Sequence, residues 1–317
     1  MEGVVIKPRG FCAGVERAIR AVELALDQYG APIYVRKEIV HNSHVVARLR
    51  ALGAVFVEEL DEVPSGAIAI LSAHGSPPWV YELAEQRGLR LIDATCPLVT
   101  KVHREVHRFI RDEYHIVFIG HEGHDEVIGT MGQAPRHTSL VQDLAGAQSL
   151  ALPPDRKGVI LTQTTLSQDD TREIVETLLR RFPLLELPPS DDICYATQNR
   201  QNAVKDAAAD LDLLLVVGSR NSSNSKRLTE VARSRGVASH LIDGPEFIES
   251  QWLHGVRCVG VTSGASAPED VVQQVVARLR ELGVERWREV VAPDEGVVFR
   301  LPPFVELTRQ GGSAARS

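Results

Sequence analysis

Three cysteines occupy the same kind of sequence setting. Cys12, Cys96 and Cys194 each follow an apolar segment and precede a stretch with helical periodicity. A thiol at the start of a helix faces the positive end of the helix dipole and unpaired backbone N–H groups, which favour the thiolate. Because the thiolate is the form that binds soft metals, we predict that each cysteine belongs to one repeated α/β unit and that all three converge on one metal centre.

The ligand set favours an iron–sulfur cluster over zinc. Structural zinc is bound by four ligands, usually in local pairs such as C-x2-C, and the sequence contains no such pair. A Cys3His zinc site, completed by a histidine from a turn, stays an alternative. Three thiolates on an iron–sulfur cluster leave one iron without a protein ligand, and substrate chemistry would take place at that iron.

The fourth cysteine has a different setting. Cys258 lies within the apolar segment 256–261, in the middle of a predicted strand. Cysteine is among the residues most often buried in protein cores, so we predict a structural role for it.

Short apolar segments alternate with helical periodicity along the whole chain, which predicts an α/β fold with parallel strands. We expect three related units at residues 1–96, 97–193 and 194–281, followed by a C-terminal segment, 282–317, with a disordered end. Polar turns follow most of the apolar segments, and ligands bind at the carboxyl ends of parallel strands. The turns are therefore predicted to form a single site.

Each unit contributes one cysteine and two such turns. The side chains in these turns are hydrogen-bonding groups suited to phosphate oxygens, although no Walker loop or GxGxxG motif is present. Lysine and arginine are scarce there, so an anion would be held by neutral donors, protonated histidine and helix ends. The candidates are His41 and His74 in the first unit, His124, Glu126 and Thr164 in the second, and Ser222, Ser223, Asn224 and Ser266 in the third.

One of these candidates, Glu126, is placed to donate a proton. Glu126 directly follows the His124 turn, and in an enclosed site its raised pKa would keep it protonated near neutrality.

His103 and His107 are four residues apart on a predicted helix, but His103 is followed by Arg104 rather than the glutamate of a metalloprotease. We predict that these two histidines lie on a solvated helix face.

Composition excludes several classes of protein. The 317 residues carry a net charge of −7, so nucleic acid is not expected to be the main partner. The first six residues lack the basic region of a signal peptide, and no apolar run approaches the roughly 20 residues of a membrane span. Four cysteines without a secretory signal favour a reducing, cytoplasmic location and argue against a disulfide framework.

The chain resembles the LytB (IspH) family of 4-hydroxy-3-methylbut-2-enyl diphosphate reductases over nearly its whole length. The motifs that carry the resemblance are residues 8–15 (PRGFCAGV), 40–42 (VHN), 73–75 (AHG), 93–97 (DATCP), 120–124 (GHEGH), 162–167 (TQTTLS), 192–197 (DICYAT), 221–224 (NSSN) and 264–268 (GASAP).

The resemblance implies a trefoil of three α/β units around a [4Fe–4S] cluster that is ligated by Cys12, Cys96 and Cys194 and has one iron without a protein ligand. It implies that His41, His74, His124, Ser222, Ser223, Asn224 and Ser266 surround a diphosphate. The implied catalytic set is Glu126, Thr164 and His124, with Glu126 delivering protons. The electron donor would be ferredoxin or flavodoxin, since the sequence has no nucleotide-binding fingerprint.

Two other classes of function are compatible with the cysteine pattern. An iron–sulfur hydro-lyase would also use an open iron but would turn over without a reductant. A non-enzymatic iron–sulfur or zinc sensor would use the cysteines as a switch, and a His124→Ala substitution would leave its metal-dependent behaviour intact.

Overall fold

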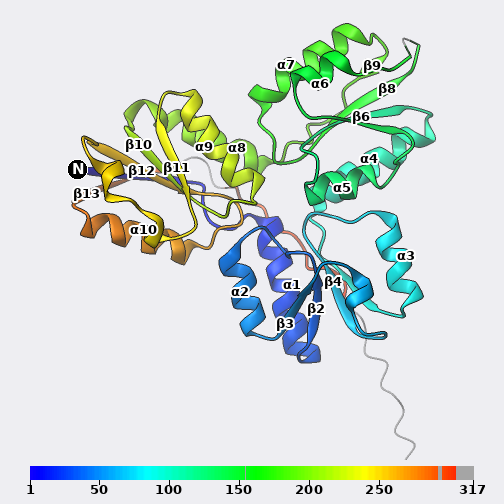
Figure 1. Cartoon of the computed structure of the whole chain (residues 1–317), viewed down its shortest axis with the longest axis horizontal. Coiled ribbons are helices and arrows are strands. Elements are labelled where there is room, and N and C mark those ends of the chain that lie inside the picture. The colour runs from blue at the N-terminus through cyan, green and yellow to red at the C-terminus, as the bar shows by residue number, and fades with distance from the viewer. Residues whose placement is uncertain (154, 292–294, 305–317) are drawn as a thin grey trace, which may run out of the picture.

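The computed structural model describes residues 1–153, 155–291 and 295–304. Three α/β units are arranged as a trefoil around a common centre (Figure 1). Each unit contains one parallel sheet with helices packed against it. The predicted fold class is confirmed.

The first sheet has the strand order β3-β2-β4-β5, and all its pairs are parallel. Its strands are β2 (Ile33–Arg36), β3 (Ala54–Val57), β4 (Ile68–Leu71) and β5 (Arg90–Asp93). The helices of this unit are α1 (Ala13–Tyr29), α2 (Ser43–Ala51) and α3 (Pro78–Gln86), with a short 3-10 turn, η1 (Leu60–Glu62).

The second sheet has the order β7-β6-β8-β9, again parallel throughout. Its strands are β6 (His115–Ile119), β7 (Thr138–Val141), β8 (Gly158–Thr162) and β9 (Leu185–Glu186). The accompanying helices are α4 (Pro97–Arg111), α5 (Asp125–Met131), α6 (Leu144–Ser149) and α7 (Gln168–Arg181).

The third sheet has five strands in the order β11-β10-β12-β1-β13. They are β10 (Leu213–Val217), β11 (Ala238–Ile242), β12 (Cys258–Ser263), β1 (Glu2–Lys7) and β13 (Arg286–Val291). The helices are α8 (Tyr195–Ala207), α9 (Ser223–Ser234) and α10 (Glu269–Glu281), with 3-10 turns η2 (Ala208–Asp210), η3 (Pro245–Phe247) and η4 (Ser250–Leu253).

The sheets divide the chain differently from the predicted ranges. The first strand, β1, pairs with β12 and β13, so residues 2–7 and 286–291 belong to the sheet of the third unit. The physical reason is burial: Val4 and Ile6 are fully buried in a core that they share with α8 and β10. Local periodicity identifies a strand but carries no information on its partner. The end predicted to be disordered includes 305–317, which lie outside the described residues.

Helix α4 illustrates how periodicity directs packing. Its apolar stripe is buried at Val99, Val102, Val106 and Phe109. These positions recur at helical spacing; Val102, Val106 and Phe109 face the second sheet, while the opposite side of the helix is charged. The stripe fixes the rotation of α4 and hence the direction in which its first residues point.

The first and second units approach each other closely at Gly129 of α5 and at Gly132, the residue that follows this helix. A methyl group on Gly129 would lie 3.0 Å from the backbone carbonyl of Gly75, and one on Gly132 would lie 2.3 Å from the Cβ of Pro77. Both partners belong to the turn between β4 and α3 of the first unit. These small residues set the distance between the two units.

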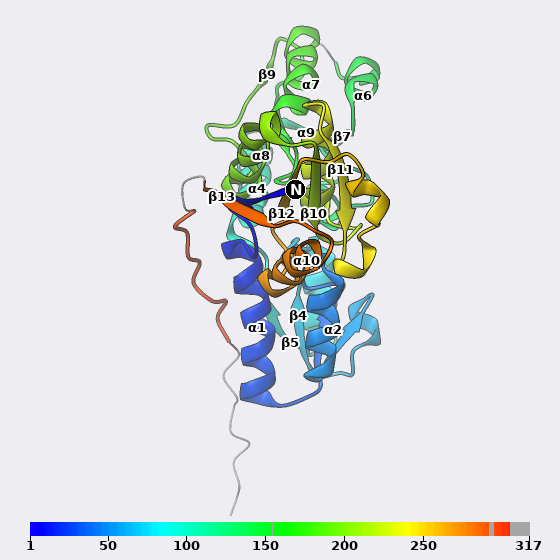
Figure 2. The same cartoon turned by 90° about the vertical axis from the view of Figure 1, so that its left-hand side faces the viewer.

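The described part of the C-terminal segment crosses from the third unit to the first, where it runs beside α1 (Figure 2). Glu295 lies 3.4 Å from the buried guanidinium of Arg200, which also donates to the carbonyl of Gly10 at 2.7 Å. Arg17 donates to the carbonyl of Arg300 at 2.7 Å, and Phe304 packs against the core of the first unit. The segment therefore connects two units around the centre.

We predict that Gly132→Ala weakens the contact between the first two units. The backbone of Gly132 has φ −63° and ψ −18°, which alanine adopts freely, so the main cost is the clash with Pro77 at 2.3 Å, with a second close approach of 3.0 Å to the Ile128 carbonyl oxygen. Overpacking of this kind typically costs about 1–3 kcal/mol. Thermal unfolding should show a lower melting temperature for this variant. The control is Gly146→Ala within α6, where the new methyl meets its nearest neighbour at 3.4 Å. An equal drop in melting temperature in both variants would contradict the role of Gly132 in the contact between the two units.

Candidate active site

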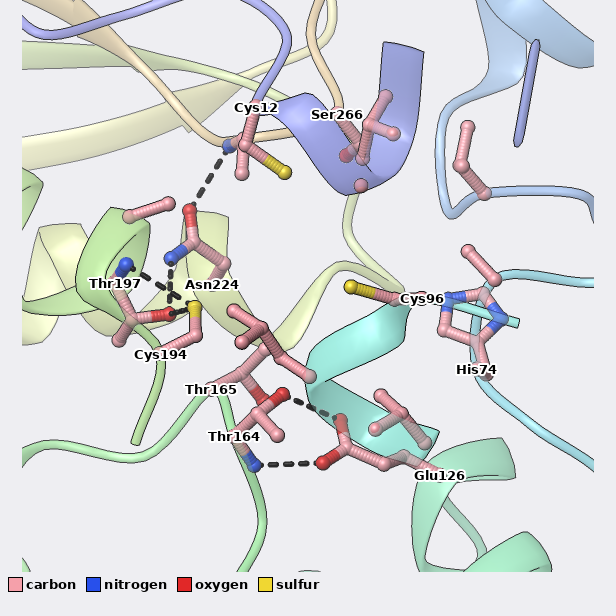
Figure 3. Close-up of a pocket in the computed structure, with 18 of the residues that line it drawn as sticks. Cys12, His74, Cys96, Glu126, Thr164, Thr165, Cys194, Thr197, Asn224 and Ser266 are labelled. Carbon is pink, nitrogen blue, oxygen red and sulfur yellow. Dashed lines mark hydrogen bonds between the residues drawn. The ribbon is translucent and has the colours of Figure 1, made fainter. Parts of the chain in front are cut away.

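The three units meet at a cavity of about 110 Å³ (Figure 3). It is lined by every residue nominated from the sequence: Cys12, Cys96, Cys194, His41, His74, His124, Glu126, Thr164, Ser222, Ser223, Asn224 and Ser266. The polar turns that follow the strands of separate sheets thus open onto one space. Their individual roles stay predictions.

Each of the three cysteines is the N-cap residue of a helix: Cys12 of α1, Cys96 of α4 and Cys194 of α8. The Cys194 Sγ accepts a hydrogen bond from the backbone N–H of Thr197 at 3.3 Å and lies 3.1 Å from its hydroxyl. The helix starts therefore direct three sulfur atoms into the same cavity, as the sequence pattern predicts (Figure 3).

The ionisation of the thiols differs from the sequence-based expectation. Burial, with a smaller contribution from the charge of Cys12, raises the pKa of Cys96 to about 12 and that of Cys194 to about 11. The backbone N–H groups at the two helix starts lower these pKa values, as the sequence predicts, but burial outweighs them. Three thiolates can share this cavity only with a compensating positive charge, which a metal centre supplies.

The space beside the cysteines fits such a group. A methyl group built on Gly14 would lie 2.7 Å from the Cys96 Sγ and 3.9 Å from the Cys12 Sγ. Glycine at this position leaves room between the sulfur atoms, and three soft donors suit an iron–sulfur cofactor. Cys258, by contrast, is buried in the core of the third unit beside Val4, as predicted.

Three histidines, one from each of three turns, gather on another side of the cavity. The rings of His41 and His74 are stacked with centroids 3.9 Å apart, and His124 lies edge-on to both at 5.3 and 5.9 Å. Burial lowers the pKa of His74 well below its usual value and that of His124 to about 3. These two rings are neutral until an anion enters and favours their protonated forms.

The start of α9 forms a third side of the cavity. Ser222 caps the helix and accepts from the backbone N–H of Ser225 at 3.3 Å. Asn224 accepts from the N–H of Ala265 at 2.9 Å and donates to the Thr197 hydroxyl at 3.3 Å. Asn224 thereby joins α9 to α8 and to the turn that carries Ser266. The positive end of the α9 dipole faces this space and favours an anion.

Glu126 is the most deeply buried acid of the cavity, with a relative exposure of 3%. Its carboxylate accepts from the Thr164 N–H at 2.6 Å and from the Thr164 hydroxyl at 3.0 Å (Figure 3). Burial raises its pKa to about 7, and the nearby Asp192 adds to the rise. A substantial fraction of Glu126 therefore carries a proton near neutrality.

Several features of the site were not evident from sequence patterns. Thr165, Tyr195 and Phe299 also line the cavity. Tyr195 is adjacent to Cys194, and that adjacency was the only available signal, whereas Phe299 reaches the site only through the path of the C-terminal segment. His44, three residues after His41, does not line the cavity, because its Nε2 lies 2.7 Å from the Asp243 carbonyl oxygen.

One prediction about α4 needs correction. His107 is exposed, as expected, and contacts Gln133. His103 instead packs against the turn at Gly75 and is largely buried, and burial lowers its pKa to about 4. The sequence pattern placed both on a solvated face because it carried no information on the neighbouring unit that covers His103.

Comparison with known proteins places this geometry in a family. A family model described as "LytB protein" matches residues 4–280. The chain belongs to the LytB family. Membership implies an iron–sulfur cofactor, which agrees with the cysteine set.

Relatives are similar over nearly the whole chain. Proteins named 4-hydroxy-3-methylbut-2-enyl diphosphate reductase are 56% identical in Mycolicibacterium paratuberculosis, covering 96% of this chain and 92% of the relative, and 56% identical in Acidothermus cellulolyticus, covering 99% and 93%. The solved structure of the Plasmodium falciparum reductase superposes with a TM-score of 0.92 at 41% identity, covering 95% of each chain. A second solved structure, described as the terminal enzyme of the non-mevalonate pathway, has a TM-score of 0.62 at 31% identity and covers 89% of this chain and all of that one.

A helix that crosses a membrane must be both long and apolar. Within 1–153, 155–291 and 295–304, no helix is both long enough and apolar enough to cross a bilayer.

We predict that Gly14→Ala lowers the iron and acid-labile sulfide content of anaerobically purified protein by more than half. The added methyl would occupy the space between two sulfur atoms, while alanine within a helix does not oppose folding. Cys258→Ala is the matched control and should retain full iron content, because Cys258 lies in the core of the third unit. Loss of iron from Cys258→Ala would contradict the structural role of Cys258. Full retention of iron in Gly14→Ala would contradict the placement of the cofactor beside Gly14.

Proposed function

We propose that this chain catalyses the reductive dehydroxylation of (E)-4-hydroxy-3-methylbut-2-enyl diphosphate to isopentenyl diphosphate and dimethylallyl diphosphate. The observation that carries the proposal is the meeting of three thiols, a protonatable buried glutamate and a set of hydrogen-bonding side chains suited to phosphate in one cavity. In the overall reaction the C4–O bond breaks, two electrons and two protons are consumed, the oxygen leaves as water, and a C–H bond forms at either end of the allyl group.

The diphosphate would be bound by His41, His74, His124, Ser222, Ser223, Asn224 and Ser266. These side chains come from all three units, so the substrate contacts all of them at once. Holding a group remote from the reacting carbon orients the hydroxymethyl end in the cavity. The start of α9 adds the attraction of its dipole.

The cofactor would be a [4Fe–4S] cluster held by Cys12, Cys96 and Cys194, with one iron lacking a protein ligand. When bound, such a cluster supplies electrons and a Lewis-acidic iron. Since the sequence has no nucleotide-binding fingerprint, the electrons would come from a protein donor such as ferredoxin or flavodoxin.

Glu126 and Thr164 would handle the protons. The carboxyl group of Glu126 is held at both oxygens by Thr164, which fixes its direction within the cavity. The His124 Nδ1 accepts from the Glu126 N–H at 3.2 Å, so the neutral ring carries its proton on Nε2 and acts as a donor. This arrangement gives the site a proton source and a neutral hydrogen-bond donor at adjacent positions.

A single-turnover experiment tests the function. Anaerobic, chemically reduced protein with confirmed iron and sulfide is mixed with the hydroxymethylbutenyl diphosphate, and the products are separated by chromatography. We expect both five-carbon diphosphates. Turnover without reductant would support the hydro-lyase alternative, and absence of any product from fully loaded protein would contradict the proposed reaction.

We predict that Glu126→Gln retains the cluster and binds substrate but loses turnover by a factor of about 10²–10⁴, the usual contribution of a general acid. Glutamine can keep both contacts to Thr164 but cannot deliver a proton.

For the wild-type chain, the protonated form of Glu126 predominates below its pKa of about 7. Turnover should therefore fall as the pH rises through 7, measured as initial rate with a chemical reductant. Full activity of Glu126→Gln would show that Glu126 does not deliver the proton.

A further inference from the structure

The start of the C-terminal segment 295–304 is fixed beside the turn that carries Cys12. Arg200 of α8 donates to both carboxylate oxygens of Glu295 at 3.4 Å and to the carbonyl of Gly10 at 2.7 Å. The Arg200 side chain is 1% exposed, so these contacts are shielded from water. Gly10 precedes Cys12 by two residues, and one buried guanidinium therefore joins the segment to the approach to this cysteine.

A second arginine fixes the same segment five residues further along. Arg17 of α1 donates to the carbonyl of Arg300 at 2.7 Å and to the carbonyl of Thr95 at 3.0 Å. Thr95 directly precedes Cys96. Residues 295–300 thus cross from α8 to α1, where the segment is seen beside the helix (Figure 2), and both fixed points lie next to the backbone that leads into a cysteine.

Apolar side chains surround the three cysteines within the cavity. The first turns of the three helices that start at the cysteines supply Val15, Leu98, Val99 and Ala196. Phe299 also lines the cavity, and it comes from the segment between the two fixed points. Phe299 is half-buried, whereas the neighbouring Val298 is 91% exposed. The segment therefore turns one apolar side chain towards the cavity and the adjacent one towards solvent.

We propose that residues 295–300 form a fixed cover over the cofactor side of the cavity, in which Phe299 shields the iron–sulfur cluster from water and dissolved solutes. The apolar shell of a metal site controls how far solvent reaches the metal. The helix starts supply part of this shell, and the segment supplies Phe299 from outside them. The inference rests on the cluster of the proposed function, but it does not depend on the proposed reaction.

The test measures release of iron from anaerobic protein that carries its full iron and sulfide content. Ferrozine, a coloured chelator of ferrous iron, is added without substrate, and the rate of colour formation is recorded. Phe299→Ala should release iron faster than the wild type by a factor of about 10, the size of effect typical of residues outside the ligand shell. Phe299→Leu keeps an apolar side chain at this position and should restore most of the slow release.

Val298→Ala is the matched control, because it shortens an apolar side chain of the same segment that points into solvent. It should release iron at the wild-type rate. Release at the wild-type rate from Phe299→Ala, or release as fast as that of Phe299→Ala from either Val298→Ala or Phe299→Leu, would overturn the shielding role. Because the measurement needs no substrate, a failure of the proposed reaction is distinguishable from a failure of the cover.

Discussion

Burial of charge at the centre of the trefoil is the constraint on which the rest of the structure depends. Three thiols and a carboxyl group share one enclosed cavity, and desolvation holds the pKa of Cys96, Cys194 and Glu126 above their usual values. The same desolvation lowers the pKa of His74 and His124. The protein alone therefore offers a site with little net charge. It is suited to receive a metal centre that compensates the thiolates and an anion that compensates protonated histidine.

Such a site needs walls from several elements, because a single sheet edge leaves its turns exposed to water. The three units provide these walls by placing the carboxyl ends of their strands around one space, each with a helix that starts at a cysteine. Contacts between units are close where side chains are small, as at Gly129 and Gly132, and polar where the C-terminal segment meets Arg17 and Arg200. Closure around a substrate would use these same contacts, since the groups proposed to bind it belong to different units.

The histidine side of the cavity combines opposing electrostatic demands. An anion is favoured by the start of α9 and by neutral donors, yet Glu38 and Asp125 lie on either side of His41. Carboxylates at this position oppose a diphosphate unless a proton or another cation lies between them.

The sequence by itself determined the alternation of strands and helices, the three cysteines at helix starts and the polar turns, because each of these is a local pattern of spacing and residue type. The family motifs, from the residues around Cys12 to the turn at Ser266, were equally readable. Only the tertiary structure decided that β1 completes the third sheet, that His103 is covered by a neighbouring unit and that Phe299 reaches the cavity. It also decided the pKa of Glu126 and of the cysteines. Strand partners, coverage and desolvation are properties of contacts between distant segments, which no local pattern encodes.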